Sequence, residues 1–362
     1  MLSDRVKNMK PSGIRKFFSL AAKMDRCLDL SIGQPDFDVP KTLKELAKSA
    51  IDEGKNSYTP SVGVELARDA VRKKYNIVNS EDYDVIITSG VSGGLLLSYA
   101  AILDEGDEIL IPDPYFVGYK EIAMLVGAKP VLFNTYPDFV PNIETLEKLT
   151  TSRTKAVVIG NPSNPTGYVL KAEELKALVS FAKKKGIYLI FDEIYECFTY
   201  DGIHIRPDLD DQIIILNGLS KSHGMTGWRI GWVVAKKNMI DEMQKLQQFS
   251  YVCAPSPFQQ LIPEALNYFD NNIFDNYKNK RDRAYEKLSK KFEIVKPGGA
   301  FYIFPKLSNM SASKFVEKSI ANSVLVIPGS VFSNSDTHFR ISFTVSDEIL
   351  DEAIEILARI SE

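Results

Sequence analysis

The sequence predicts an α/β protein with a large domain, in which a mostly parallel sheet of seven strands lies between helices. A smaller α+β domain is expected from the N-terminal arm together with the C-terminal part. Two observations predict this fold. From residue 85 onward, short apolar runs alternate with amphipathic stretches of helical periodicity, as in repeated strand–helix units. Several of the apolar runs are continuous, which is typical of strands that helices cover on both faces.

The first 43 residues are expected to form an arm and part of the small domain. The stretch from Ser31 to Pro40 is rich in Gly, Pro and Asp, which favours irregular backbone. Helices are then predicted at 41–53 and 64–75, because apolar residues recur there on one face, with a loop at 56–63. Since the arm and the C-terminal unit both flank the large domain, we expect them to pack together.

The large domain is expected to span residues 44–280 and the small C-terminal domain residues 281–362. The seven strands of the large sheet are predicted at 85–88, 108–111, 130–133, 156–160, 188–191, 212–216 and 230–235. Helices are predicted at 95–103, 115–126, 143–149 and 172–185, and from about residue 237 the chain is expected to be helical through 291. The small domain is predicted to hold strands at 292–295, 300–304, 324–327 and 338–343, and helices at 312–319 and 347–360.

The composition argues against several classes of protein. The net charge of -3 means that the chain has no excess of basic residues, which argues against nucleic acid as a main ligand. No apolar run approaches the roughly 20 residues that cross a bilayer, and the N-terminus lacks the apolar segment of a signal peptide. The three cysteines are far apart and odd in number, which indicates reduced thiols in a cytoplasmic protein. The histidines form no metal-ligand spacing with them, so no metal is expected.

Ligands of open α/β sheets bind beyond the carboxyl ends of the strands, so the residues that follow each strand are candidates for a site. After the first strand, the glycine-rich stretch 89–94 leads into a helix. There Gly90, Val91 and Ser92 could present backbone N–H groups to an anion. Taken alone, the stretch is explained more simply as a turn.

Two further strand ends carry polar groups. The stretch N-P-S-N-P-T-G at 161–167 contains two Asn-Pro pairs, which favour a rigid turn that leaves the amide of Asn164 free for a ligand. Turn chemistry alone is the alternative. Asp192 ends a buried strand, where an unpaired acid is costly, but a helix N-cap explains it equally well. Tyr195 lies three residues further on, so both side chains could face one ligand.

The stretch from Asn217 to Gly231, N-G-L-S-K-S-H-G-M-T-G-W-R-I-G, follows another apolar strand. Lys221, just past the end of that strand, could be a nucleophilic amine, because burial lowers the pKa of a lysine. A solvated surface lysine is the commoner case. Near the C-terminus, Arg340 lies on a predicted strand and could grip a carboxylate through two parallel hydrogen bonds. An exposed strand face is the alternative there.

These residues taken together favour one kind of ligand. A lysine, an acid, a tyrosine, an asparagine, an anion cradle and two separated arginines suit a phosphorylated cofactor that carries a carbonyl group, beside an acidic substrate. Pyridoxal 5'-phosphate fits this set of groups. A nicotinamide-dependent dehydrogenase does not fit, because no G-x-G-x-x-G follows a strand with an acid about 20 residues further on.

The chain resembles the class I/II pyridoxal-phosphate-dependent aminotransferases of fold type I, the family that includes aspartate aminotransferases. The motifs N-P-x-N-P-T-G, D-E-x-Y and S-K-x-x-x-x-x-G-W-R-x-G occur in the family's order and approximate spacing. The resemblance covers nearly the whole chain. It implies an aspartate-aminotransferase-like enzyme that moves an amino group between an L-amino acid and a 2-oxo acid with ping-pong kinetics.

The resemblance also implies a role for each matching residue of the cofactor site. Lys221 corresponds to the lysine that binds the cofactor covalently, and Asp192 to the partner of the pyridine N–H. Tyr195 and Asn164 correspond to donors to the ring oxygen, and Phe116 to the aromatic residue that stacks on the ring. The residues that correspond to phosphate contacts are Gly90, Val91, Ser92, Ser220 and Arg229.

For the substrate, the resemblance assigns the α-carboxylate to Arg340, with Gly33 and Asn164 nearby. Tyr58 corresponds to a tyrosine that reaches the phosphate in the neighbouring subunit, which implies a homodimer with its active sites at the interface. There are departures from the family. Gly218 stands where many relatives have serine, and Phe116 replaces a tryptophan that is frequent in the aspartate-type branch.

Three points are left open by the sequence. A β-elimination lyase or a synthase of the same fold would use the same residues, and a non-catalytic cofactor-binding protein is a further alternative. The identity of the amino acid is not fixed, because no second cation for a distal carboxylate stands out. The loop 250–257 either shapes a neutral or aromatic pocket or only connects two helices.

Overall fold

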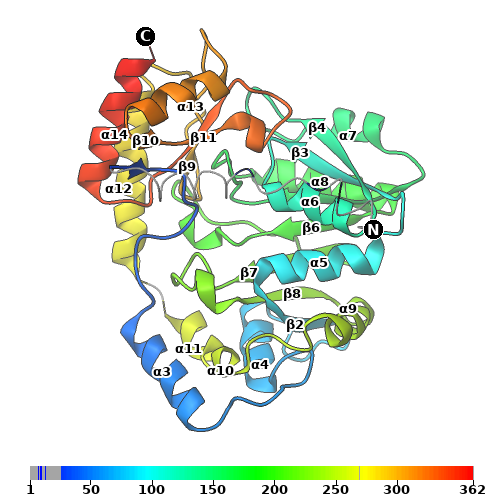
Figure 1. The fold of residues 1–362 in the computed structure, drawn as a ribbon. Coiled ribbons are helices and arrows are strands. Elements are labelled where there is room, and N and C mark those ends of the chain that lie inside the picture. Colours follow the sequence, from blue (N-terminus) through cyan, green and yellow to red (C-terminus); the bar gives the residue numbers. More distant parts are fainter. Residues whose placement is uncertain (1–6, 8, 10–12, 14–25, 269, 362) are drawn as a thin grey trace.

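A computed structural model describes residues 26–268 and 270–361, together with Lys7, Met9 and Gly13. Its largest element is a seven-stranded sheet of order β2-β8-β7-β6-β5-β3-β4. The β3–β4, β3–β5, β5–β6 and β6–β7 pairs are parallel, and β8 is antiparallel to both β2 and β7. The prediction of a mostly parallel, seven-stranded α/β sheet is therefore confirmed (Figure 1).

All seven predicted apolar runs are strands of this sheet, and most extend one to three residues beyond the apolar run. Backbone pairing continues past the apolar residues because it does not depend on the side chain. The strands are β2 (Tyr83–Ser89), β3 (Glu108–Asp113), β4 (Lys129–Asn134), β5 (Thr154–Gly160), β6 (Tyr188–Asp192), β7 (Ile213–Gly218) and β8 (Ile230–Lys236).

Helices cover both faces of the sheet, as the continuous apolar runs predicted. Successive side chains of a strand point to opposite faces, so Ile213 and Ile215 of β7 pack into one hydrophobic core while Ile214 and Leu216 pack into the other. The first core also receives α3 (Lys41–Asp52), α4 (Glu65–Lys74), α7 (Ile143–Leu149), α8 (Ala172–Lys185) and α11 (Ile262–Asn267). The second receives α5 (Gly90–Ile102), α6 (Val117–Leu125) and α9 (Lys237–Ser250).

A separate hydrophobic core lies under the C-terminal elements. Figure 1 shows α12, α13 and α14 gathered at one end of the molecule. Strand β1 (Leu28–Asp29) pairs in parallel with β10 (Val324–Leu325), and a three-stranded sheet has the order β11 (Ile327–Pro328), β12 (Phe339–Ser342), β9 (Tyr302–Ile303). The helices of this part are α12 (Asn271–Leu288), α13 (Ala312–Ala321) and α14 (Asp347–Ile360). The β1–β10 pair joins the end of the N-terminal arm to this part, although most of the arm lies outside the described residues.

Several predicted elements were wrong. Helix α5 begins at Gly90 and not at residue 95, because the glycines let the helix pack closely on the sheet. A Cβ on Gly94 would lie 2.9 Å from Leu216 and 3.0 Å from Val233. Residues 292–295 form only an isolated bridge between Glu293 and Lys306 and no strand.

The region predicted to be helical from 237 to 291 is divided into four helices. Prolines account for the breaks before α10 and α11, since a proline is tolerated in the first turn of a helix but not in the interior. Accordingly, α10 (Ser256–Gln259) and α11 each carry a proline at their start. Of the predicted loop 250–257, residues 251–255 connect α9 to α10, and the remaining residues belong to these two helices. Short 3-10 helices lie at η1 (Glu196–Phe198), η2 (Thr226–Trp228) and η3 (Gly329–Val331). None of the described helices is long and apolar enough to cross a membrane.

Candidate active site

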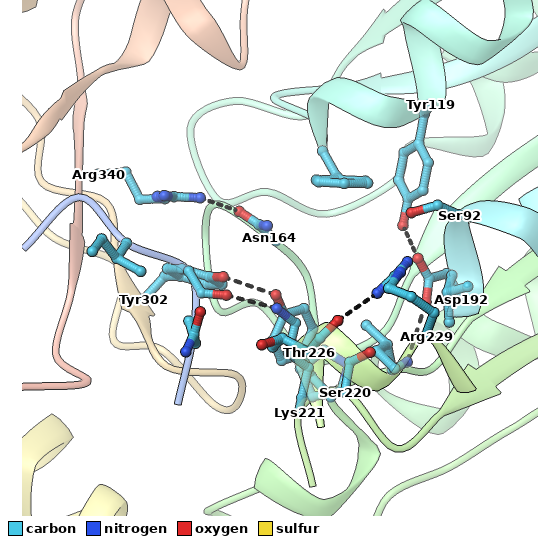
Figure 2. Close-up of a pocket in the computed structure, with 18 residues that line it drawn as sticks. Ser92, Tyr119, Asn164, Asp192, Ser220, Lys221, Thr226, Arg229, Tyr302 and Arg340 are labelled. Carbon is cyan, nitrogen blue, oxygen red and sulfur yellow. Dashed lines mark hydrogen bonds between the residues drawn. The ribbon is translucent and has the colours of Figure 1, made fainter. Parts of the chain in front are cut away.

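A cavity of about 290 Å³ lies where the carboxyl ends of the parallel strands face the three-stranded sheet (Figure 2). It brings together residues that are up to 308 positions apart in the chain, from Ile32 to Arg340. Of the residues predicted from the sequence, Gly33, Val91, Ser92, Phe116, Asn164, Asp192, Tyr195, Ser220, Lys221, Arg229 and Arg340 line it. The other lining residues are Ile32, Gln34, Tyr119, Pro162, Ile194, Thr226 and Tyr302.

Lys221 follows β7 and projects into this cavity. Its Nζ donates a hydrogen bond of 2.6 Å to the backbone oxygen of Gly33. Burial lowers the pKa of Lys221 to about 8, and the positive charges of Arg340 and Arg229 act in the same direction. A substantial fraction of the amine is therefore neutral near pH 8, which is the state that a nucleophile or a proton acceptor needs.

Asp192 is the last residue of β6 and is only 4% exposed. Tyr119 donates to its Oδ2 at 2.9 Å, and the backbone N–H of Ile194 donates to its Oδ1 at 3.2 Å. Burial raises the pKa of Asp192 to about 6, while these two hydrogen bonds act against that rise. Within the described part of the chain its carboxylate makes no ion pair, so a ligand with a cationic N–H would relieve the cost of burying it.

Arg340 lies on β12 and is 1% exposed. It donates from Nη1 to Asn164 Oδ1 at 3.0 Å and from Nη2 to the backbone oxygen of Ser31 at 2.7 Å, and its Nε has no partner among the described residues. The rings of Tyr302 and Phe332 lie 4.5 and 4.6 Å from its Cζ and hold the guanidinium between them. A buried arginine without a carboxylate among the described residues fits a ligand carboxylate.

The start of α5 forms an anion cradle with Arg229. No side chain of the described residues caps the helix at Ser89 and its first turn has no acid, so its N–H groups can face an anion. A Cβ on Gly90 would lie 2.6 Å from the guanidinium of Arg229, which explains the glycine. Arg229 Nη1 donates to the backbone oxygen of Thr226 at 2.8 Å. Gly90 itself does not line the cavity, but it lets Arg229 approach the helix.

The geometry also explains the departure at Gly218. A Cβ there would lie 2.7 Å from the backbone oxygen of Ile230 and 2.9 Å from Gly231, so β7 and β8 leave no room for a side chain. The hydroxyls in this half of the cavity come from Ser92, Ser220 and Thr226. Thr226 was not predicted from the sequence.

Tyr119 and Tyr302 are further polar residues that the sequence did not indicate. Tyr119 lies on α6 three residues after Phe116, close to one helical turn, and this spacing was a signal that could have identified it. Tyr302 has no such local signal, because only the β9–β12 pair, with Tyr302 opposite Ser342, brings it to the cavity. Figure 2 shows Tyr119 directed at Asp192 and Arg340 directed at Asn164 across the cavity.

Tyr58 is, besides Gly90, a predicted residue that does not line this cavity. It lies in the segment between α3 and α4, and its side chain is 84% exposed. Among the described residues, the side chain of Tyr58 makes no hydrogen bond that would explain why a tyrosine stands at this position. The expected role of Tyr58 in the site of a neighbouring subunit stays a prediction.

This fold and this constellation of lysine, acid and anion cradle define a family. Residues 25–357 match the family "Aminotransferase class I and II", and the chain belongs to it. It is 39% identical to a probable N-acetyl-LL-diaminopimelate aminotransferase of Bacillus subtilis, over 99% of this chain and 95% of the relative. It is 35% identical to aromatic-amino-acid aminotransferase 2 of Thermococcus litoralis, over 99% of this chain and 98% of the relative.

Solved structures give the same result. The aspartate aminotransferase from Thermus thermophilus with maleate superposes with a TM-score of 0.94 at 33% identity, covering 99% of both chains. The chain is therefore an aminotransferase with the fold of the aspartate aminotransferases. The named relatives favour amino-group transfer over the elimination and synthase chemistry that the sequence left open.

Proposed function

We propose that this aminotransferase uses pyridoxal 5'-phosphate, bound in the cavity between Lys221 and the start of α5. The observation that carries the proposal is the position of Lys221 and Asp192 in one cavity, together with the anion cradle. A buried amine with a pKa of about 8 and a buried carboxylate without a described ion-pair partner are both costly in a site that binds nothing. The aldehyde of pyridoxal 5'-phosphate matches the amine of Lys221, and its pyridine nitrogen matches the carboxylate of Asp192.

Each part of the cofactor has a partner in this chain. Ser92, Ser220, Thr226, Arg229 and the first backbone N–H groups of α5, at Gly90 and Val91, would hold the phosphate. Asp192 would keep the ring nitrogen protonated, because an adjacent negative charge favours the charged form. Tyr195 and Asn164 would donate to the ring oxygen, and Phe116 would pack on the ring. When bound, the cofactor supplies an electron sink for the substrate Cα.

Lys221 and Arg340 act on the substrate itself. The Nζ of Lys221 takes the proton from the substrate Cα and later returns a proton, and a pKa near the working pH suits it for both steps. Arg340 binds the α-carboxylate, with Gly33 and Asn164 beside it, and so fixes the direction of the Cα–H bond. The two half-reactions, with an L-amino acid and then a 2-oxo acid, give ping-pong kinetics.

A half-reaction screen tests this function. The protein loaded with pyridoxal 5'-phosphate is mixed with single amino acids while the absorbance of the bound cofactor is followed. We expect that at least one L-amino acid removes this absorbance and that a 2-oxo acid restores it. Continued release of ammonia and a 2-oxo acid from the amino acid alone would indicate a lyase. No response to any amino acid would contradict the proposal.

Lys221→Ala tests the assignment of the lysine. The variant keeps the anion cradle and should bind the cofactor, but borohydride should not fix the cofactor to the protein. Since Lys221 is also the proposed proton acceptor, activity should fall by roughly 10³-fold or more. If borohydride still attaches the cofactor, another lysine carries it.

We further propose that the enzyme is a homodimer, in which Tyr58 reaches the phosphate of the neighbouring subunit. Two exposed aromatic side chains support this proposal, since Tyr58 is 84% and Phe249 is 92% exposed in the single chain. Buried in an interface, both would leave water. The hydroxyl of Tyr58 would then donate a hydrogen bond to a group outside its own chain, the phosphate in the neighbouring subunit.

A mixing experiment tests the arrangement of the two subunits. Lys221→Ala and Tyr58→Ala homodimers should each have little activity. In a mixed dimer, the site of the Tyr58→Ala subunit has its own lysine and receives Tyr58 from the partner. Refolding the two variants together should therefore restore up to about a quarter of the wild-type activity, as two-fold symmetry dictates. No gain on mixing would contradict the exchange of Tyr58.

Two other features concern the location of the protein and the limits of its domains. We propose a cytoplasmic location, supported by the free thiols of Cys27, Cys197 and Cys253. We also propose the domain limits 1–43, 44–280 and 281–362, supported by the separate hydrophobic core of the C-terminal elements. The limits at 43 and 280 fall inside α3 and α12, so a protease is expected to cut first in the loops beside these two helices.

A further inference from the structure

Two buried tyrosine hydroxyls meet at the edge of the cavity. The hydroxyl oxygens of Tyr195 and Tyr302 lie 2.8 Å apart, and the side chains are 5% and 1% exposed. Tyr195 follows strand β6 of the large sheet, and Tyr302 belongs to β9 of the three-stranded sheet. This hydrogen bond therefore links the half of the cavity that would hold the cofactor to the half that holds Arg340.

The position of Tyr302 is fixed from three sides. Its backbone pairs with Ser342 of β12, and its ring lies 4.5 Å from the Cζ of Arg340. Its hydroxyl oxygen lies 2.5 Å from the place that a Cβ on Gly33 would take, so only glycine leaves room for it. A side chain held in this way can set the direction of the hydroxyl that it contacts.

The two hydroxyls share one hydrogen bond, so one of them is the donor. If Tyr195 is to donate to the ring oxygen of the cofactor, it needs its own proton for that bond. The bond between the two tyrosines must then use the proton of Tyr302. The positive charge of Arg340 favours this direction, because it draws electron density from the Tyr302 ring and opposes the rise in the pKa of Tyr302 that burial causes.

We propose that Tyr302 is a positioning residue, which donates to Tyr195 and strengthens the hydrogen bond from Tyr195 to the ring oxygen of the cofactor. The inference rests on the proposed use of pyridoxal 5'-phosphate. Consecutive hydrogen bonds polarise one another, so a hydroxyl that accepts one bond is a better donor in the next. Tyr302 thereby acts on the cofactor without touching its ring oxygen.

The consequence is a change in the acidity of the bound cofactor. A donor to the ring oxygen would draw negative charge away from the Nζ of Lys221 when the cofactor is joined to it. The Nζ would then lose its proton at a lower pH, and this loss would change the absorbance of the bound cofactor. Removing the Tyr302 hydroxyl should weaken the donor and move the midpoint of this absorbance change to higher pH.

Tyr302→Phe tests the proposal, because it removes the hydroxyl and keeps the ring against Arg340. The variant is loaded with pyridoxal 5'-phosphate and titrated without substrate from about pH 5 to about pH 10. We expect the midpoint to rise by about half a pH unit relative to wild type. The matched control is Tyr200→Phe, which removes another buried hydroxyl, one that donates to the backbone oxygen of Ala300 outside the cavity, and should leave the midpoint unchanged.

A double variant shows whether Tyr302 acts on the cofactor through Tyr195 or directly. Tyr195→Phe should shift the midpoint further than Tyr302→Phe, and adding Tyr302→Phe to it should cause no further shift. An unchanged midpoint in Tyr302→Phe, or an equal shift in both backgrounds, overturns the inference. If Tyr302→Phe does not fold, Tyr302→Leu gives a second side chain without a hydroxyl, and a rise in its midpoint is expected. A wild-type protein that binds no pyridoxal 5'-phosphate contradicts the proposed cofactor and not the tyrosine pair.

Discussion

The hydroxyl of Tyr119 donates a hydrogen bond of 2.9 Å to Oδ2 of Asp192, and among the described residues that carboxylate makes no ion pair. Burial and hydrogen bonding therefore act on Asp192 in opposite directions. Burial dominates and raises its pKa to about 6, compared with a usual value of 3.8. In the cofactor-free protein, an ionised Asp192 at neutral pH is consequently a source of instability.

Asp192→Asn should make the cofactor-free protein more stable at neutral pH. Because the folded pKa of Asp192 is raised, its contribution to stability is fully present below about pH 4 and is lost as the pH rises through about 6. The shift of about two units corresponds to about 3 kcal/mol at pH 7. Asparagine does not ionise and avoids this loss. Urea unfolding of both proteins at several pH values measures the difference.

The expected pattern in pH is specific. The two proteins should converge near pH 4, where Asp192 is protonated, and Asp52→Asn, an exposed control on α3, should follow the wild type throughout. A stability gap that does not depend on pH would contradict the assignment to ionisation. With cofactor added, Asp192→Asn should lose roughly 100-fold or more in kcat, because the fixed charge beside the ring nitrogen is gone.

Tyr119→Phe should change how cofactor binding depends on pH. The hydrogen bond from Tyr119 lowers the pKa of Asp192, so its removal raises that pKa further. Binding that needs an ionised Asp192 weakens as the pH falls through the pKa. In the variant this weakening should begin at a pH about half a unit higher than in wild type. Titration of the cofactor-free protein with pyridoxal 5'-phosphate at each pH gives the dissociation constants.

Tyr99→Phe is the matched control for that experiment. Tyr99 is fully buried, and in the part of the chain that the structure describes its hydroxyl has no hydrogen-bond partner. Losing this hydroxyl should leave the pH dependence of binding unchanged. If Tyr119→Phe and Tyr99→Phe behave alike, the Tyr119 hydroxyl does not control the protonation of Asp192.

The sequence predicted the site well where chemistry follows directly from a strand. Asp192 and Lys221 come just at or after the ends of two continuous apolar runs, and adjacent parallel strands end at the same edge of a sheet. Their proximity therefore followed from local pattern and topology. The three-stranded sheet was harder to predict, because its strands are two to four residues long and their register depends on tertiary contacts. Tyr302 was missed for that reason.

The prediction for the start of α5 was wrong for a different reason. Glycines disfavour helices, and the pattern 89–94 therefore predicted a turn. In the fold, Gly94 packs against the sheet and Gly90 against Arg229, so close approach outweighs helix propensity. A sequence that looks unfavourable for a helix but lies beside a ligand cradle is thus a place where local rules and function conflict.

Arg340→Lys should weaken substrate binding with little change in fold. The guanidinium is held by Asn164 and Ser31 and can offer a carboxylate two parallel hydrogen bonds, which a single ammonium cannot. We expect kcat/KM for amino acids to fall by roughly 10²- to 10³-fold, mainly through KM. Steady-state kinetics with the best donor from the half-reaction screen measures this.

The control for Arg340 is an amine donor without a carboxylate. Such a substrate cannot use the guanidinium, so wild type and Arg340→Lys should process it at similar, low rates. Arg359→Lys, on the exposed face of α14, should leave both substrates unaffected. An equal loss with both donors would assign Arg340 a structural role in place of carboxylate binding.

Gly33→Ala should be destabilising, and Tyr302→Phe should partly repair it. The new methyl group would lie 2.5 Å from the Tyr302 hydroxyl oxygen but 3.4 Å from its Cζ, so the clash comes from the hydroxyl. Overpacking of this kind costs about 1 to 3 kcal/mol. Removing the hydroxyl relieves it, and the two substitutions should therefore couple by about 1 kcal/mol or more in a double-mutant cycle of unfolding free energies.

Gly227→Ala, where a Cβ meets nothing within 4 Å, is the neutral control. Strictly additive effects would mean that Gly33 is required for a reason other than the space that Tyr302 fills.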